Sequence, residues 1–137
     1  MGICKECGKK AARSTYSYCS NKCQHNYQYK AFIKAWKLDE VEGGIGINAK
    51  NISGHVKRYL ARKYLKGCAL CGWDVINQTT GRIPLEIDHI DGNSENNKEE
   101  NLRLLCPNCH SLTPFFRNLN KGNGRSWRRA KYVKVMQ

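Results

Sequence analysis

The sequence has no long apolar run. Its first thirty residues contain no stretch that would serve as the core of a signal peptide, and nothing later approaches the length of a membrane span. Repeats of the kind that build solenoids are also lacking. A chain of 137 residues can form one compact domain or two very small ones, and neither half would bury much of a core unaided. We therefore expect a protein without membrane association whose fold needs cross-links.

Acidic residues are scarce outside the middle of the chain. Residues 1–67 carry 14 Lys and Arg against 4 Asp and Glu, residues 68–117 carry 4 against 7, and residues 118–137 carry 6 against none. The net charge of +13 is therefore placed on two arms around a mildly acidic centre. This asymmetry predicts a polyanionic partner, DNA or RNA, bound with an affinity that falls as salt rises. A merely solubilising surface is the alternative.

The eight cysteines all fall in close pairs, and long intervals separate the pairs. Such spacing is typical of zinc sites in a reducing compartment and not of a secreted disulfide scaffold. The simplest closure gives two structural Zn²⁺ sites with four thiolates each. Their ligands are Cys4, Cys7, Cys19 and Cys23 in the first site, and Cys68, Cys71, Cys106 and Cys109 in the second.

The N-terminal segment, residues 1–45, reads as a four-cysteine zinc module followed by a helix. His25 is close enough to take the place of Cys23 as a ligand, although four cysteines already complete a site. Apolar residues recur at intervals of three and four from Gln24 to about Glu40, which predicts an amphipathic helix with an aromatic stripe in the core. The module is either purely architectural or a contact for nucleic acid.

Residues 46–67 read as a basic helical connector. We expect a flexible connection over 41–51 and then a helix from about Ser53, its N-cap, to Lys66, with Gly67 at its C-terminal end. Such a helix would lie along a phosphate backbone or in a major groove, or would only present a solvated face. The cations that we expect to contact DNA here are Lys57, Arg58, Arg62 and Lys63.

The segment 68–117 has the order knuckle, strand, loop, strand, knuckle, helix. Neighbouring strand residues point to opposite faces, so Asp88 and His89 are expected to act from two sides of one phosphate. If Asp88 faces the helix that carries His110, the two side chains can hold one divalent ion and leave positions open for water and a phosphate oxygen. The imidazole of His89 is suited to taking a proton from water at neutral pH.

The strings IDHIDGN (residues 87–93) and NLRLLCPNCH (residues 101–110) resemble those of HNH endonucleases, also called ββα-metal nucleases, of the small phage type. The resemblance covers about a third of the chain. It implies an α+β fold with a small zinc-stabilised ββα-metal, or treble-clef, core over residues 68–117, preceded by the N-terminal zinc knuckle and helices. It also implies the cytoplasm of a bacterial or phage-infected cell as the location.

The resemblance further implies the roles of four residues. His89 would be the general base, and Asp88 and His110 would hold a catalytic Mg²⁺, Mn²⁺, Ni²⁺ or Zn²⁺ ion. Asn101 would orient His89 and the hairpin or approach the metal itself. Some relatives carry a further histidine four residues after the last motif histidine, where this chain has Pro114. We therefore expect water and DNA to complete the metal site.

The implied activity is metal-dependent hydrolysis of DNA, which leaves 5′-phosphate and 3′-hydroxyl ends. A zinc-finger protein that binds nucleic acid without catalysis is the alternative. One active site per chain suggests nicking by a monomer, and a double-strand break would need a homodimer or two events. Residues 118–137 read as a basic tail that is either disordered until it meets DNA or helical from about Ser126. Arg117 near the core and three tail residues complete the expected DNA contacts: Arg125, Arg128 and Arg129.

Overall fold

The computed structural model describes residues 2–46 and 51–122, and the chain divides into two compact units, Met1–Val41 and Glu42–Gln137. Each unit is considered by itself. The predicted contacts Arg125, Arg128 and Arg129 lie outside the described residues. No helix in the described part of the chain is long and apolar enough to cross a membrane.

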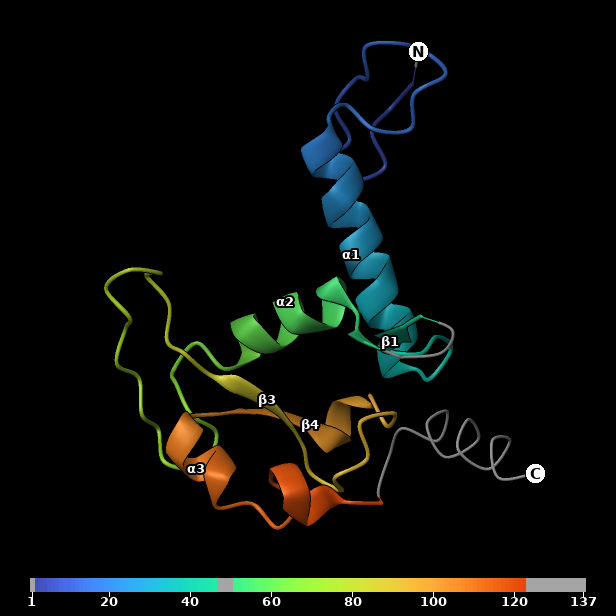
Figure 1. Cartoon of the computed structure of the whole chain (residues 1–137). Helices are drawn as coiled ribbons and strands as arrows, with labels where there is room; N and C mark the ends of the chain where they lie inside the picture. Colours follow the sequence, from blue (N-terminus) through green and yellow to red (C-terminus); the bar gives the residue numbers. More distant parts are fainter. Residues whose placement is uncertain (1, 47–50, 123–137) are drawn as a thin grey trace, which may run out of the picture. The chain divides into compact units, whose positions relative to one another are not determined.

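The first unit consists of the cysteine-rich loops and the long helix α1 (Asn21–Lys37) (Figure 1). The helix begins three residues before the predicted start because Ser20 caps it, its hydroxyl accepting a hydrogen bond from the Cys23 N–H at 3.2 Å. It ends before Asp39, which takes a left-handed φ of 57°. The end predicted at Glu40 was therefore too late.

The aromatic stripe predicted for this helix is buried in the structure. Tyr29, Ile33 and Trp36 have at most 8% of their surface exposed, whereas Phe32 is half-buried. These residues recur at intervals of three and four, so they share one face of α1. Their burial confirms that the stripe serves packing.

The second unit begins with a small sheet where a flexible connection was expected. Strands β1 (Gly44–Ile45) and β2 (Asn51–Ile52) pair antiparallel. Helix α2 (Gly54–Lys63) follows, and the predicted N-cap is confirmed because the Ser53 hydroxyl accepts a hydrogen bond from the His55 N–H at 3.1 Å. The helix ends three residues before the predicted Lys66.

Helix α2 is fixed to the second unit by its apolar face and by one polar contact. Val56 and Leu60 are fully buried. The Tyr59 hydroxyl donates a hydrogen bond to Glu99 at 2.5 Å. After the helix, Gly67 has φ +109°, and a Cβ there would lie 2.4 Å from the Trp73 carbonyl oxygen, so only glycine fits.

The centre of the second unit is a hairpin of β3 (Glu86–His89) and β4 (Leu102–Leu105), joined through a loop and the 3-10 helix η1 (Glu99–Asn101). Helix α3 (Pro107–Ser111) follows, which gives the predicted order strand, strand, helix. The helix is shorter than the predicted extent to Phe116 because Pro114 disfavours helical geometry at the residue before it. The 3-10 helix η2 (Arg117–Asn120) comes next.

The hairpin has two faces with different neighbours. Asp88 pairs with Arg103 and His89 with Leu102, and paired residues of an antiparallel ladder share a face. Asp88 faces α3, since its Oδ1 atom lies 3.9 Å from the Nε2 atom of His110 on that helix. His89 is the next residue of the strand and therefore points to the opposite face. Figure 1 shows α2 and α3 on either side of the hairpin. On the α3 side, the core cluster consists of Cys68, Leu105 and Cys106, packed with Trp73, Leu85 and Cys109.

Candidate metal and catalytic centre

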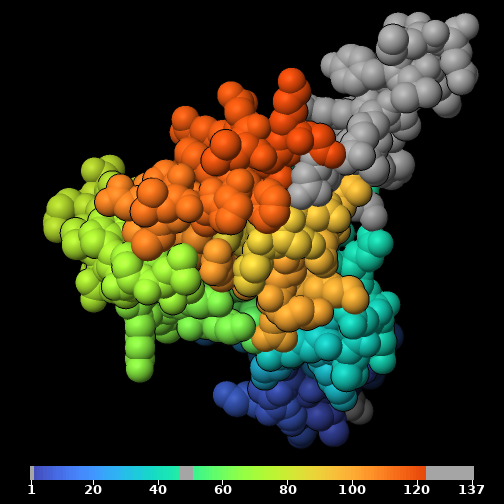
Figure 2. Space-filling model, turned by 90° about the horizontal axis from the view of Figure 1, so that it is seen from below, coloured from blue at the N-terminus to red at the C-terminus, as the bar shows by residue number. Residues whose placement is uncertain are grey.

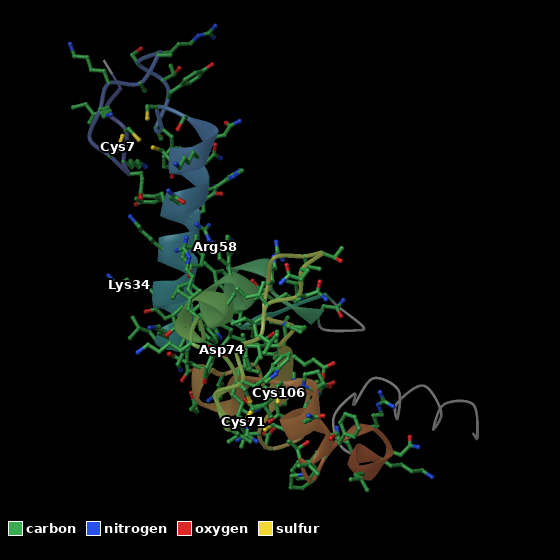
Figure 3. The ribbon with its side chains drawn as sticks, turned by 90° about the vertical axis from the view of Figure 1, so that its left-hand side faces the viewer. Cys7, Lys34, Arg58, Cys71, Asp74 and Cys106 are labelled. Carbon is green, nitrogen blue, oxygen red and sulfur yellow. The ribbon has the colours of Figure 1, made fainter. Side chains whose placement is uncertain are left out.

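The second four-cysteine group joins the start of the hairpin region to α3. The four thiols lie within 4.8 Å of one another, and the Sγ atoms of Cys71 and Cys106 are 3.7 Å apart (Figure 3). Thiolates about 2.3 Å from a central zinc would be about 3.8 Å apart in a tetrahedron. Cys106 is also the N-cap of α3, since its Sγ accepts a hydrogen bond from the Cys109 N–H. The group is thus suited to hold one metal ion.

The first four-cysteine group has the same geometry in the other unit. The Sγ atom of Cys19 lies 3.5 Å from that of Cys7 and 3.5 Å from that of Cys23, and Cys4 completes the set within 4.8 Å. His25, the alternative ligand, is exposed and lies outside this group. All eight cysteines are free thiols, in agreement with metal sites and against disulfides.

The pKa values of the thiols differ widely within each group. Burial raises the pKa of Cys4, but hydrogen bonds from backbone N–H groups outweigh burial and lower the pKa to about 6. The same balance lowers the pKa of Cys68 to about 6. Hydrogen bonding to Cys71 raises the pKa of Cys109 to about 12. A cation is therefore needed to hold four thiolates together at neutral pH.

Asp88 and His110 meet on the α3 side of the hairpin, as the sequence predicts. The His110 Nε2 atom is 3.9 Å from the Asp88 Oδ1 atom, and the Asp88 side chain is only 7% exposed. The other ring nitrogen of His110, Nδ1, is 2.5 Å from Glu86 Oε2. Glu86 was missed by the sequence reasoning, although it lies two residues before Asp88 and therefore shares its face of the strand.

Arg103 is the second polar neighbour of Asp88 that the sequence reasoning missed. Its Nε–H donates to Asp88 Oδ2 at 2.7 Å, and the two residues are direct partners in the hairpin register. The Arg103 guanidinium binds the Oδ2 atom of Asp88, and the other carboxylate oxygen, Oδ1, lies nearer to His110. The buried charge of Asp88 is thus paired, and its other oxygen is directed toward His110.

His89 lies on the other face of the hairpin and contacts a residue that was not predicted. Its Nε2 atom is 2.8 Å from the Asn97 Oδ1 atom, and Asn97 is buried. The side chain of Asn101 bonds the loop: its Oδ1 accepts from the Asp91 N–H, and its Nδ2 donates to the Asp91 carboxylate and to the Asn96 carbonyl. Asn101 thus holds the hairpin loop, and Asn97 contacts the imidazole.

The loop carboxylate Asp91 collects several of these hydrogen bonds. Burial raises its pKa, but donors from the Asn96 side chain, the Asn93 backbone and the Asn101 side chain outweigh burial and hold the pKa of Asp91 below its usual range. A carboxylate that accepts several donors is stabilised in its charged form. The loop beside His89 is therefore fixed by an ionised Asp91.

A cavity of about 510 Å³ opens beside His110 and is lined by Glu86, His110, Phe116 and Arg117 among others. The ring of Phe116 meets the His110 ring edge-on at 5.3 Å, and the Arg117 guanidinium lies 4.9 Å above the Phe116 ring. Figure 2 shows this side of the unit, with the residues from α3 to η2 in orange to red beside the hairpin loop in yellow. Arg117 has a left-handed φ of 49°, a strained geometry for a residue with a Cβ.

The basic residues predicted on α2 lie on the other side of the hairpin from this cavity. Lys57 and Arg62 are exposed, Arg58 is half-buried and is labelled on α2 in Figure 3. Lys63 is 3.6 Å from Glu99, which balances part of its charge. The cations of α2 and Arg117 therefore flank the hairpin from two sides.

Comparison with known proteins gives two matches. The sequence model of the HNH endonuclease family matches residues 68–113. The H-N-H endonuclease F-TflIV of Escherichia phage T5 is 49% identical over 55 residues, which make up 40% of this chain and 23% of that protein. The match thus spans less than a quarter of the length of the relative. No solved structure matches the chain.

The family match covers the segment that carries the two motif strings. Together with the hairpin, α3 and the two four-cysteine groups, the two matches confirm the predicted fold class and the predicted resemblance. The matched segment holds Asp88, His89 and His110, but neither match identifies the role of a single residue.

Proposed function

We propose, on the premise that residues 68–113 form an HNH endonuclease domain, that this protein hydrolyses phosphodiester bonds of DNA with the help of a divalent metal ion. The observation that carries the proposal is the pairing of Asp88 with His110 across the α3 face, with His89 at the adjacent strand position. A purely structural zinc module has no need of a carboxylate, an imidazole and a second imidazole in this order.

The spacing of Asp88 and His110 fits a divalent ion. Two ligand atoms, each about 2.1 Å from one ion, lie at most about 4.2 Å apart. The separation of 3.9 Å is too long for a hydrogen bond and lies just below this limit. An ion held there would stabilise the negative charge that develops on the phosphoryl oxygens and on the leaving 3′ oxygen.

Glu86 completes this arrangement by fixing the tautomer of His110. We assign a hydrogen to Nδ1, which donates to Glu86, so that the lone pair of Nε2 is directed toward Asp88. Metal-binding histidines commonly donate their second ring N–H to a carboxylate, which orients the ring and raises its basicity. Pro114 occupies the position where some relatives carry a further histidine. Glu86 does not replace that histidine as a metal ligand, but it orients the ligand His110.

The chemical step that we propose uses His89 as the general base. His89 takes a proton from a water molecule, and the water oxygen forms a bond to phosphorus while the bond from phosphorus to the 3′ oxygen breaks. The leaving oxygen takes up a proton from solvent. The products are a 5′-phosphate and a 3′-hydroxyl. Arg117 lies at the cavity edge, where its guanidinium can bind a phosphate oxygen.

The remaining contacts to DNA are proposed to be electrostatic. The centre of the chain is mildly acidic, so cations outside it must offset repulsion of the duplex. On α2 these are Lys57, Arg58, Arg62 and Lys63, and the predicted contacts Arg125, Arg128 and Arg129 add to them. A monomer with one such centre is expected to nick, and a homodimer would be required for concerted double-strand cleavage.

The two four-cysteine groups are proposed to hold one structural Zn²⁺ ion each. Four thiolates at tetrahedral spacing are the ligand set that zinc prefers in structural sites. Metal analysis of freshly purified protein should return two zinc ions per chain. A value of one or less would count against the N-terminal site.

The cleavage assay should use supercoiled plasmid, with Mg²⁺, Mn²⁺, Ni²⁺ or Zn²⁺ added in separate reactions and EDTA as the control. We expect conversion to nicked or linear plasmid only where a divalent ion is present. Plasmid that stays intact with every ion, while the protein still binds it, would favour the alternative function, a zinc-finger protein that binds nucleic acid without cutting.

A further inference from the structure

We propose that Asn97 is a positioning residue for His89, which keeps the hydrogen of the neutral imidazole on Nε2 and leaves the lone pair on Nδ1 free to take a proton from water. This inference rests on the proposed role of His89 as the general base. It assigns a role to a residue that lies outside both motif strings.

The contact that carries the proposal joins the His89 Nε2 atom to the Asn97 Oδ1 atom at 2.8 Å. An amide oxygen can only accept a hydrogen bond, so the ring nitrogen facing it must donate. A neutral imidazole has one N–H group, and the second nitrogen then keeps its lone pair. The general base of the reaction is therefore Nδ1.

The burial of Asn97 makes this contact a restraint. Only 6% of Asn97 is exposed, whereas His89 is half-buried at the end of β3. If a buried amide oxygen loses its hydrogen-bond donor, the free energy of unfolding falls, because no water replaces the bond. The imidazole is therefore held in one orientation while its other nitrogen can face outward.

Asn101 supports the same restraint through the backbone. Its Nδ2 donates to the Asn96 carbonyl at 2.8 Å and to Asp91 at 2.9 Å, and its Oδ1 accepts from the Asp91 N–H at 2.9 Å. These bonds fix both ends of the loop segment that precedes Asn97. Asn101 thus acts on His89 through Asn97, which explains how a motif asparagine influences the base without contacting its ring.

The tautomer can be measured directly by long-range ¹H–¹⁵N NMR of the four histidines in zinc-loaded protein, with the His89 signals identified from a His89→Gln sample. We expect Nε2 to be protonated and Nδ1 unprotonated in the wild type, a mixture of tautomers in Asn97→Ala, and a return to protonated Nε2 in Asn97→Asp, whose carboxylate accepts the same bond. The matched control is Asn93→Ala, which removes an asparagine side chain of the same loop that accepts a hydrogen bond from the Glu95 N–H and leaves the backbone bonds of residue 93 in place.

Cleavage kinetics give the second measurement. Asn97→Ala should lower kcat by a factor on the order of 10 to 100, by analogy with the loss of a partner that orients a metal-binding histidine, and should leave KM for DNA unchanged. Asn93→Ala should change neither quantity appreciably. A merely structural role of Asn97 would instead lower the stability of Asn97→Ala while His89 keeps its wild-type tautomer.

Two results would overturn the proposal: a wild-type His89 protonated on Nδ1, or an Asn97→Ala variant that keeps the wild-type tautomer. The NMR measurement needs no cleavage. If the wild type fails to cut DNA but shows the expected tautomer, the proposed function is wrong and the role of Asn97 in orienting His89 still holds.

Discussion

The two four-cysteine groups have the same ligand type and nearly the same sulfur spacing, yet their surroundings differ. In the first unit, eleven residues separate the two cysteine pairs, and they form only a short loop. In the second, 34 residues separate the pairs, and they contain the hairpin with Glu86, Asp88 and His89. A metal-binding group alone therefore does not indicate catalysis. Only the second group encloses the residues that we propose to be catalytic.

The largest effect is expected at a cysteine that belongs to the second four-cysteine group and also follows directly after the hairpin with the proposed catalytic residues. Cys106→Ser should prevent folding of the second unit and abolish cleavage, because zinc binding to such a group contributes about 10 kcal/mol or more to folding. Serine would retain the cap of α3 but not a thiolate ligand. Zinc content and circular dichroism measure the loss, and Asn108→Ala in the same helix should retain the metal and the fold. A folded, zinc-loaded Cys106→Ser variant would contradict the structural role of the site.

The corresponding change in the first unit tests whether the second unit depends on the first zinc site. Cys4→Ser should release one zinc ion and unfold Met1–Val41, while the second unit keeps its fold and its metal. The cleavage rate at saturating DNA should then stay close to that of the wild type. Loss of cleavage with an intact second unit would show that the first module takes part in the chemistry.

A smaller effect is expected from the residue that orients His110. Glu86→Gln should weaken binding of the catalytic ion about tenfold to a hundredfold, since it replaces a charged acceptor by a neutral one. Titration calorimetry with Mn²⁺ on zinc-loaded protein measures the affinity without cleavage. An unchanged affinity would mean that Glu86 has no influence on the ion.

The smallest effect is expected from a single cation on α2. Arg62→Ala should reduce DNA affinity and lower the slope of log K against log salt by about 0.9, the value for one lost phosphate contact. Arg82→Ala removes an equal charge from the exposed loop before β3 and serves as the matched control. Equal effects of both substitutions would indicate that only net charge matters and that α2 makes no specific contact.

Much of this architecture could be predicted because it depends on local spacing. Cysteine pairs locate metal groups, Ser53 locates the start of α2, and alternation on a strand places Asp88 and His89 on different faces. The same alternation predicts that Glu86 lies on the same face of the strand as Asp88. The end of α3 was missed because the effect of Pro114 on the preceding residue was not taken into account.

The contacts of Asn97, Arg103 and Phe116 could not be predicted in this way. Each depends on tertiary geometry: the loop must return Asn97 to His89, the hairpin register must place Arg103 opposite Asp88, and the chain after α3 must bring Phe116 back to His110. No periodic pattern in the sequence marks any of them. The supporting residues of the site therefore became apparent only in three dimensions.

The central claim is tested most directly by comparing wild type with His89→Ala in single-turnover plasmid cleavage at saturating Mn²⁺, with DNA binding measured in parallel. We predict that the variant binds DNA as the wild type does and cuts it about 10² to 10⁴ times more slowly, the usual contribution of a general base. A His89→Ala variant that cuts as fast as the wild type would contradict the account.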